Sequence, residues 1–161
     1  MSRKTMTVFL RILLLGLTAA GCLFFFAFLP FYGSEMVRVN PEYEWAYLPC
    51  LIWAWLFAAP LFAAVIPAWR IFGTVKKKGG AFSAANAKRF RLIAVLLCSD
   101  GFLFPIGMFV MAWLGAGSAP LTLVISPVVF LFMNGAGFLC YVLSRLVQES
   151  AEMREENDLT V

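Results

Sequence analysis

An acidic residue inside an apolar stretch is the part of this chain most able to do chemistry. Asp100 is the only charged residue in the segment 92–114, and Ser99 precedes it. On a helix Asp100 would lie about 13 Å from Arg91, and Asn134 would lie at a similar depth in the next apolar segment. A carboxylate costs at least about 2.5 kcal/mol at the centre of a membrane-spanning helix, and such residues commonly mark ion sites. Asp100, Asn134 and Ser99 are therefore a candidate intramembrane polar site. It either binds protons or ions, or links two helices through a protonated or hydrogen-bonded Asp100.

Charged side chains gather in two further segments, and each could bind a partner. The segment 70–91 carries seven Lys or Arg and no acid. In the segment 145–161 acids recur at spacings of three and four residues, which places them on one face of a helix. The basic segment would attract anionic lipid, and the acidic face is either a docking surface or a solvated tail. The candidate partner-binding residues are Lys76, Lys77, Lys78, Lys88, Arg89, Arg91, Glu149, Glu152, Glu156, Asn157 and Asp158.

No residue pattern matches a catalytic or metal site. The chain has no His and no phosphate-binding glycine loop, so metalloprotease and nucleotide-hydrolase motifs are excluded. The cysteines lie within apolar segments without metal-ligand spacing and are expected to pack as small apolar side chains. They are Cys22, Cys50, Cys98 and Cys140. We therefore predict a protein that is not an enzyme and that needs no cofactor or metal.

The elements that must position these residues are four apolar helices. Of 161 residues 62% are hydrophobic and 14% are charged, against about 45–50% and about 25% in soluble domains. Four segments, 12–33, 46–69, 92–114 and 120–144, exceed the length of about 20 residues that crosses a bilayer core. Backbone amides in hydrocarbon must be paired within their own segment, so each span should be a helix. The predicted fold is a single all-α integral membrane domain, a bundle of four transmembrane helices.

The distribution of charge predicts the topology. Lys and Arg near the ends of spans are retained in the cytoplasm, so the basic loop 70–91 should face the cytoplasm. The segment 34–45 carries a net negative charge and the connector 115–120 carries none, so both should lie outside. The N- and C-termini are then cytoplasmic. Residues 145–156 contain no Gly or Pro, so the fourth helix should extend into the cytoplasm as an acidic tail, 145–161.

The N-terminus has two interpretations. Residues 2–22 have a basic start, an apolar run and a cysteine, as in a lipoprotein signal. Ala19 stands where such signals usually carry Leu, and Cys22 is followed by Leu-Phe-Phe-Phe instead of a polar mature start. These two features favour an uncleaved first span.

In the basic loop, Ser83 precedes a helical stretch and is expected to cap it.

Three short stretches carry a resemblance to a known family. They are 82–91 (FSAANAKRFR), 146–150 (LVQES) and 155–161 (EENDLTV), with Ala-Pro-Leu-Phe at 59–62 in the second span. With them the chain resembles the bacterial membrane-protein family catalogued as domain of unknown function 2975. The resemblance implies a four-span protein of the bacterial cytoplasmic membrane. It also implies an association with a very small helix-turn-helix regulator, since such genes are neighbours in that family.

Two functions remain open on this basis. The first is a regulatory or scaffold protein that binds a small cytoplasmic DNA-binding regulator through the basic loop and the tail. The second is a small transporter, exporter or immunity-type protein built around Asp100. The lipid bilayer is a partner in either case. Direct binding of nucleic acid is not expected, because anionic lipid is the polyanion nearest to the basic loop.

Overall fold

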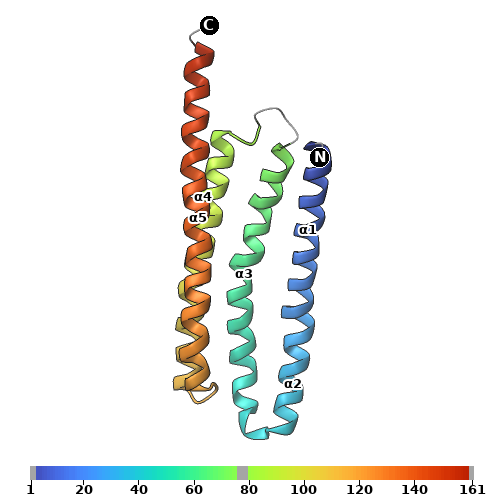
Figure 1. The fold of residues 1–161 in the computed structure, drawn as a ribbon. Helices are drawn as coiled ribbons and strands as arrows, with labels where there is room; N and C mark the ends of the chain where they lie inside the picture. The colour runs from blue at the N-terminus through green and yellow to red at the C-terminus, as the bar shows by residue number, and fades with distance from the viewer. Residues whose placement is uncertain (1–2, 76–79, 160–161) are drawn as a thin grey trace.

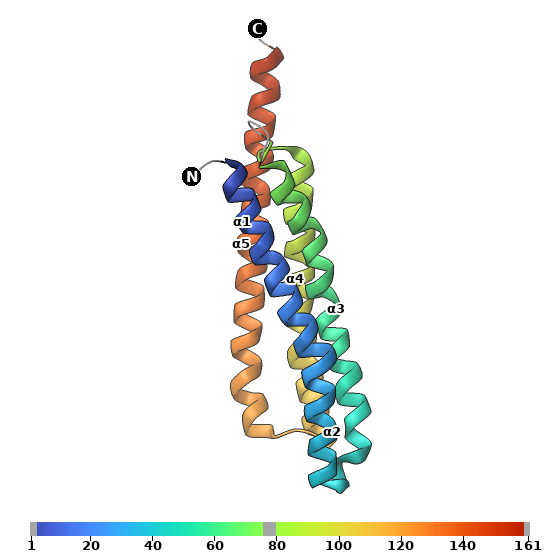
Figure 2. The same ribbon diagram turned by 90° about the vertical axis from the view of Figure 1, so that its right-hand side faces the viewer.

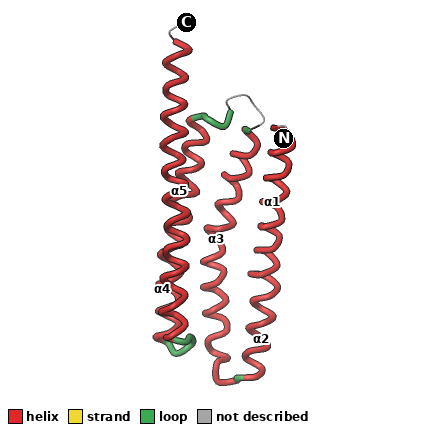
Figure 3. The backbone as a smooth tube through the Cα atoms, viewed as in Figure 1, coloured by secondary structure: helices red, strands yellow, loops and turns green. Residues whose placement is uncertain are grey.

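Helices form almost all of the structure. The computed structural model describes residues 3–75 and 80–159, and side chains within 4–75 and 80–154. The elements are α1 (Arg3–Leu23), a π-helix η1 (Phe24–Phe28), α2 (Leu29–Val39), a short 3-10 helix η2 (Pro41–Tyr43), α3 (Glu44–Thr74), α4 (Ala84–Trp113) and α5 (Ala119–Leu159). Loops are confined to the ends of the long helices (Figure 3). The predicted all-α class is confirmed.

Four helical stretches are long and apolar enough to cross a membrane, so the chain is a multi-pass membrane protein. They are Lys4–Val39, Pro41–Thr74, Ala84–Trp113 and Ala119–Arg154. The first, second and fourth stretches contain the predicted spans 12–33, 46–69 and 120–144 and extend beyond both ends of each. The third begins before the predicted span 92–114 and ends one residue short of it, at Trp113. Helical hydrogen bonding continues past the apolar residues because the flanking residues, charged ones included, are compatible with a helix.

The first stretch joins α1, η1 and α2 into one long helix that is fastened to α3. The π-helix precedes Pro30, which has no amide hydrogen, and π-turns of this kind leave a carbonyl free for a side chain. The indole nitrogen of Trp55 donates to the carbonyl of Phe25 over 3.0 Å. Further along, the hydroxyl of Tyr47 donates to the carbonyl of Pro30 over 3.2 Å. The Tyr47 ring lies against Gly33, where a Cβ would be 2.7 Å from it. These contacts hold the first helix at the level of η1 and α2.

Within the described residues, the long helices contact one another in chain order. The first helix packs on α3, α3 packs on α4, and α4 makes its most extensive contact with α5. Figure 1 shows α3 between α1 and the α4–α5 pair, and Figure 2 shows the same helices from the side of α1. The bundle is therefore open, with α1 and α5 on its outside and α4 covered from two sides.

Small residues let α4 and α5 approach closely. Gly137 on α5 lies against Cys98 and the carbonyl of Ala94, so a side chain at this glycine would have no room. The hydroxyl of Ser144 donates to the carbonyl of Ala87 over 2.7 Å. Close packing of small residues and hydrogen bonds between helices are the means by which membrane helices associate, because lipid is as apolar as their side chains.

Both ends of the chain lie at one end of the bundle. The N-terminus, the α3–α4 connection and the projecting part of α5 share that end in Figures 1 and 2. Helix α5 has 41 residues, or about 61 Å at 1.5 Å per residue. This is about twice the apolar thickness of a bilayer. The prediction that the fourth span continues as a helix is confirmed.

The predicted basic loop 70–91 is mostly helical in the structure. Helix α3 continues to Thr74 and α4 begins at Ala84, so most of the bases described here lie on helix ends. The cap explains the early start of α4, since the Ser83 hydroxyl accepts a hydrogen bond from the backbone nitrogen of Asn86 over 3.4 Å. The expected capping role of Ser83 is confirmed. Lys76, Lys77 and Lys78 lie outside the described residues.

Candidate functional site

Asp100 lies in the middle of α4, on the side that meets α3. One turn further along α4, the Phe104 ring packs against Trp53 and Phe57 of α3, with centroid distances of 5.5 and 5.1 Å. Residues four apart on a helix share a face, which places Asp100 beside α3 as well. The residue has no solvent-exposed surface. The structure thus encloses the acid within protein, and does not turn it toward lipid.

The expected hydrogen bonds of Asp100 are not formed. Neither carboxylate oxygen has a hydrogen-bond partner in the described part of the chain. The Asn134 amide instead donates to the carbonyl of Phe130 in its own helix, over 2.9 Å. Ser99 is exposed, because adjacent residues on a helix project about 100° apart and do not share a face. The hydrogen-bonded link between Asp100, Asn134 and Ser99 was therefore a wrong expectation.

Asn134 nevertheless lies at the depth of the acid. A Cβ on Gly101 would collide with the Asn134 amide, so this glycine lets the amide reach the α4 backbone one residue from Asp100. The nearest bases along the packed helices are far away. Arg91 on α4 is about 13 Å distant along the axis, and Arg70 on α3 and Arg145 on α5 lie toward the same end of the bundle. Among the described residues no charged partner thus offsets the desolvation of the Asp100 carboxyl, and burying such a group without a partner is costly.

A second polar cluster centres on Asn86, at the end of the bundle that carries the termini. Asn86 is fully buried, and its amide nitrogen lies 2.7 Å from the hydroxyl of Thr74. The same nitrogen lies 3.1 Å from the carbonyls of Gly80 and Ala81. The Arg89 guanidinium donates to the Asn86 side-chain oxygen over 2.7 Å. One side chain therefore joins the end of α3, the connecting segment and the start of α4.

The Asn86 cluster engages Arg89, which was predicted to bind a partner. Arg89 is half-buried and bound to Asn86, so one edge of its guanidinium is already used. Lys88 and Arg91 are exposed and remain available to a partner. Sequence reasoning did not select Asn86 as a site residue. The signal was its place three residues after the capping Ser83, but which groups it would reach depends on how α3 and α4 pack.

The projecting part of α5 carries exposed acids. Glu149 and Glu152 are exposed, and the Gln148 amide donates to Glu152 over 3.0 Å. A small hollow of about 290 Å³ lies where Phe82 of the α3–α4 connection meets α5 at Met153. The connection and the projecting helix are therefore neighbours, as the paired basic and acidic segments suggested. Of the other predicted residues, the side chains of Glu156, Asn157 and Asp158 lie outside those described.

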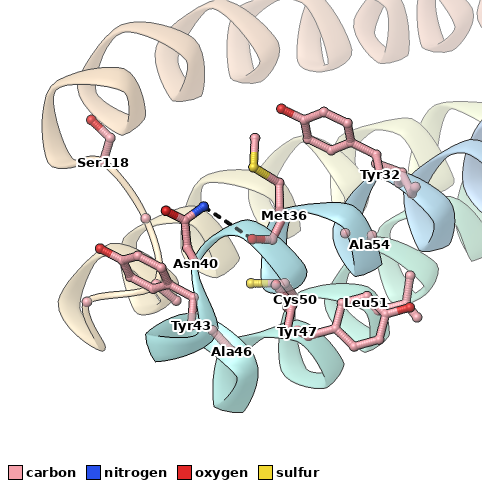
Figure 4. Close-up of a pocket in the computed structure, with 16 residues that line it drawn as sticks. Tyr32, Met36, Asn40, Tyr43, Ala46, Tyr47, Cys50, Leu51, Ala54 and Ser118 are labelled. Atoms are coloured by element: carbon pink, nitrogen blue, oxygen red, sulfur yellow. Dashed lines mark hydrogen bonds between the residues drawn. The ribbon is translucent and has the colours of Figure 1, made fainter.

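The opposite end of the bundle contains a larger cavity, which sequence reasoning missed. It has a volume of about 540 Å³ and lies between α2, the start of α3 and the α4–α5 turn. Figure 4 shows Tyr43, Met36 and Asn40 around it, with the Asn40 amide bonded to the Met36 carbonyl over 3.2 Å. None of its lining residues is charged. Three separate segments form the cavity, so no single sequence pattern identifies it.

Potential metal ligands do not cluster. In the residues that the structure describes, there is no group of three His, Cys, Asp or Glu side chains that could hold an ion. The free cysteines among them are Cys22, Cys50, Cys98 and Cys140, and the Cys50 thiol contacts the sulfur of Met111 at 3.7 Å. The candidate site residues are therefore Asp100 with its surroundings, the Asn86 cluster and the charged end of the bundle.

Comparison with known proteins identifies the family. No curated protein and no solved structure gives a significant match to this chain. One family model matches residues 31–161, which is most of the chain. The sequence resemblance noted above is confirmed, and the chain belongs to the family described as "Protein of unknown function (DUF2975)".

Proposed function

We propose that the chain is a non-enzymatic protein of the bacterial cytoplasmic membrane that binds a small soluble regulator at its cytoplasmic end. The regulator would be of the helix-turn-helix type that the family resemblance implies. The observation that carries the proposal is the length of α5. Residues 145–159 add about 22 Å of helix beyond the predicted span, and they carry exposed acids at the end where the bases gather.

The charge distribution supports a cytoplasmic position for this end. Apart from Arg38, every Lys and Arg among the described residues lies in the half of the bundle that carries the termini. Arg38 lies on α2 at the other end and is paired with Glu35 at 2.8 Å. Retention of positive charge in the cytoplasm orients membrane proteins in this way. The proposal thus places both termini and the projecting part of α5 in the cytoplasm.

The proposed docking surface is the tail surface, defined as Glu149, Glu152 and Met153 on α5. All three side chains are exposed. They lie on the projecting part of α5, and among the described elements only α4 packs on α5. An apolar side chain beside two acids suits a partner with a basic, partly apolar face. Exposed charge pairs each contribute about 0.2–1 kcal/mol and act mainly on association rate and specificity. Binding should therefore weaken with salt.

Charge reversal tests this proposal. The double variant Glu149→Lys and Glu152→Lys should insert normally but lose a cytoplasmic partner that co-purifies with the wild-type protein after cross-linking in cells. The matched control is Glu42→Lys with Glu44→Lys, which makes the same change of charge at the opposite end of the bundle. Equal recovery of every partner with both double variants would show that the tail surface does not dock a regulator.

A second candidate function, a small transporter, exporter or immunity-type protein, is favoured by one observation. Asp100 is fully buried and has no hydrogen-bond partner, and ionisable residues in this position commonly serve ion or proton pathways. In that case Asp100→Asn should abolish an ion- or pH-dependent phenotype while the protein still inserts. A silent Asp100→Asn variant in cells that depend on the wild-type protein would exclude this function.

A further inference from the structure

Arg11 is a cation that is half-buried between two helices. It lies on α1, and its side chain contacts α3 toward the end of the bundle that carries the termini. Its Nε atom is buried and forms no hydrogen bond within the described part of the chain. Among the described Lys and Arg side chains, Arg89 is the other half-buried base, and its guanidinium donates to Asn86. Arg11 therefore has a buried donor that the described chain leaves unpaired.

Two residues of α3 fix the position of this guanidinium. Its central carbon lies 4.6 Å from the centre of the Trp69 ring, which is within the range of a cation–π contact. At Gly73 a Cβ would lie 2.7 Å from a terminal guanidinium nitrogen, so the lack of a side chain there lets the cation reach the α3 backbone. Helix α3 ends one residue later, and its carbonyl end favours a cation. We call Arg11, Trp69 and Gly73 the Arg11 cradle.

The described residues place no carboxylate beside the cradle. The ion pair among them joins Arg38 to Glu35 at the opposite end of the bundle. The described acids at the end of the cradle are Glu149 and Glu152 on α5, and α5 does not pack on α1. The carbonyl end of a helix is equivalent to only about half a charge. A cation that is partly removed from water is costly without an anionic partner. An anion from outside the described chain would supply that partner.

The cradle lies at the depth of lipid phosphates. Arg11 immediately precedes the predicted span 12–33, and Trp69 is the last residue of the predicted span 46–69. Trp rings are enriched at this boundary between hydrocarbon and headgroups, and the headgroup layer on each side is about 5–7 Å thick. Helix α1 lies on the outside of the open bundle, so lipid reaches its flanks (Figures 1 and 2). The phosphate of a phospholipid is therefore the nearest anion.

We propose that the Arg11 cradle binds the phosphate group of one anionic phospholipid. The terminal nitrogens of Arg11 donate to the phosphate oxygens, because Nε is covered, and an Arg–phosphate pair of this kind is a strong charge-assisted bond. Lys4 is exposed and lies seven residues earlier on the same face of α1, about 10 Å toward water. Its charge favours an anionic headgroup over a zwitterionic one that ends in an ammonium. Basic sites between membrane helices bind acidic headgroups in this way.

The bound lipid would hold α1 to α3 at the end where the termini lie. This role goes beyond regulator docking and does not depend on it. The alternative is that Arg11 serves only as a structural contact to the Trp69 ring. The two differ in whether the protein retains a lipid and in which lipid it retains.

Native mass spectrometry of the full-length protein, released from detergent micelles, tests the site. Phosphatidylglycerol and phosphatidylcholine with the same acyl chains are added in equal amounts. The wild type should retain one phosphatidylglycerol in preference to phosphatidylcholine. Arg11→Gln keeps most of the side-chain length and removes the charge, and it should reduce this retention at least several-fold. The matched control is Arg91→Gln, which removes one exposed charge at the same end and should bind like the wild type.

A free anion is distinguished from a lipid by adding inorganic phosphate in excess, which should leave the retained phosphatidylglycerol in place. Displacement by inorganic phosphate would overturn the proposal, because the cradle would then take a soluble anion. Equal retention of the two lipids by the wild type, or equal losses in Arg11→Gln and Arg91→Gln, would also overturn it.

A test on the wild type alone covers the case in which Arg11→Gln fails to fold. Phosphatidylglycerol with a photoreactive diazirine in its headgroup is incorporated with the protein into phosphatidylcholine vesicles. After illumination, peptide mapping should place the adduct on α1 near Arg11 or on α3 near Trp69. Adducts spread evenly over the bases at this end would mean diffuse attraction of lipid to charge, and the cradle would not be a lipid site.

Discussion

Replacing Asn86 with Ala should loosen the α3–α4 connection more than any other single change at that end of the bundle. The amide has two hydrogens, so at most two of its three acceptors are strongly bonded at once. Two neutral bonds at about 1 kcal/mol and one bond to Arg89 at about 2 kcal/mol sum to about 4 kcal/mol. Some of the groups that lose Asn86 as a partner can bond to water instead, because they lie at the end of the bundle. The expected loss is therefore about 2–3 kcal/mol.

Thermal unfolding in detergent, followed by circular dichroism, measures this loss. For a chain of this length about 2–3 kcal/mol corresponds to a fall in midpoint of about 5–10 °C. Limited trypsin digestion should also cut between α3 and α4 faster in the variant. The control is Asn40→Ala at the other end, where the amide makes one bond to Met36, and where the loss should stay at or below about 1 kcal/mol. Equal midpoints for the two variants would refute the role assigned to the Asn86 cluster.

Four further outcomes follow from the packing and the charges. Gly101→Ala should destabilise the α4–α5 pair by about 1–3 kcal/mol, because a Cβ there collides with Asn134. Gly135→Ala, which meets nothing within 4 Å, should be neutral or slightly stabilising in the same unfolding assay. Trp55→Phe should lose about 1 kcal/mol with the bond to the Phe25 carbonyl, and a wild-type midpoint would show that this bond contributes nothing. Reporter fusions after residues 78 and 161 should read cytoplasmic and those after 42 and 118 external, and an external reading after 78 would overturn the topology.

The helices and the places where they begin or continue are predicted well from the sequence, because both depend on residue types along the chain. Long apolar segments without charge become spans, and the absence of Gly or Pro after Ser144 is enough to predict that α5 continues. The Ser83 cap follows from residue type and position alone. In each case the physical cause lies within a few residues of the effect.

The contacts between helices could not be predicted in the same way. Depth counting placed Asn134 at the level of Asp100 correctly, but it could not show that the amide would bond to the Phe130 carbonyl in its own helix. The reach of Asn86 to Thr74 and Gly80 depends on where α3 ends relative to α4. The cavity of about 540 Å³ requires three segments to meet. These features depend on the relative rotation and offset of helices, which a hydropathy pattern does not specify.

Photo-cross-linking in living cells tests the docking proposal most directly. A photoreactive amino acid at Glu149, on the exposed side of the projecting helix, should give one discrete adduct with a small soluble protein that binds DNA. The same probe at Glu44, at the opposite end of the bundle, should not give this adduct. Raised salt during cross-linking in isolated spheroplast membranes should reduce the adduct, because charge attraction is screened within about 8 Å at physiological ionic strength. If position 149 gives only lipid or self-adducts, or the same products as position 44, the projecting helix does not dock a regulator.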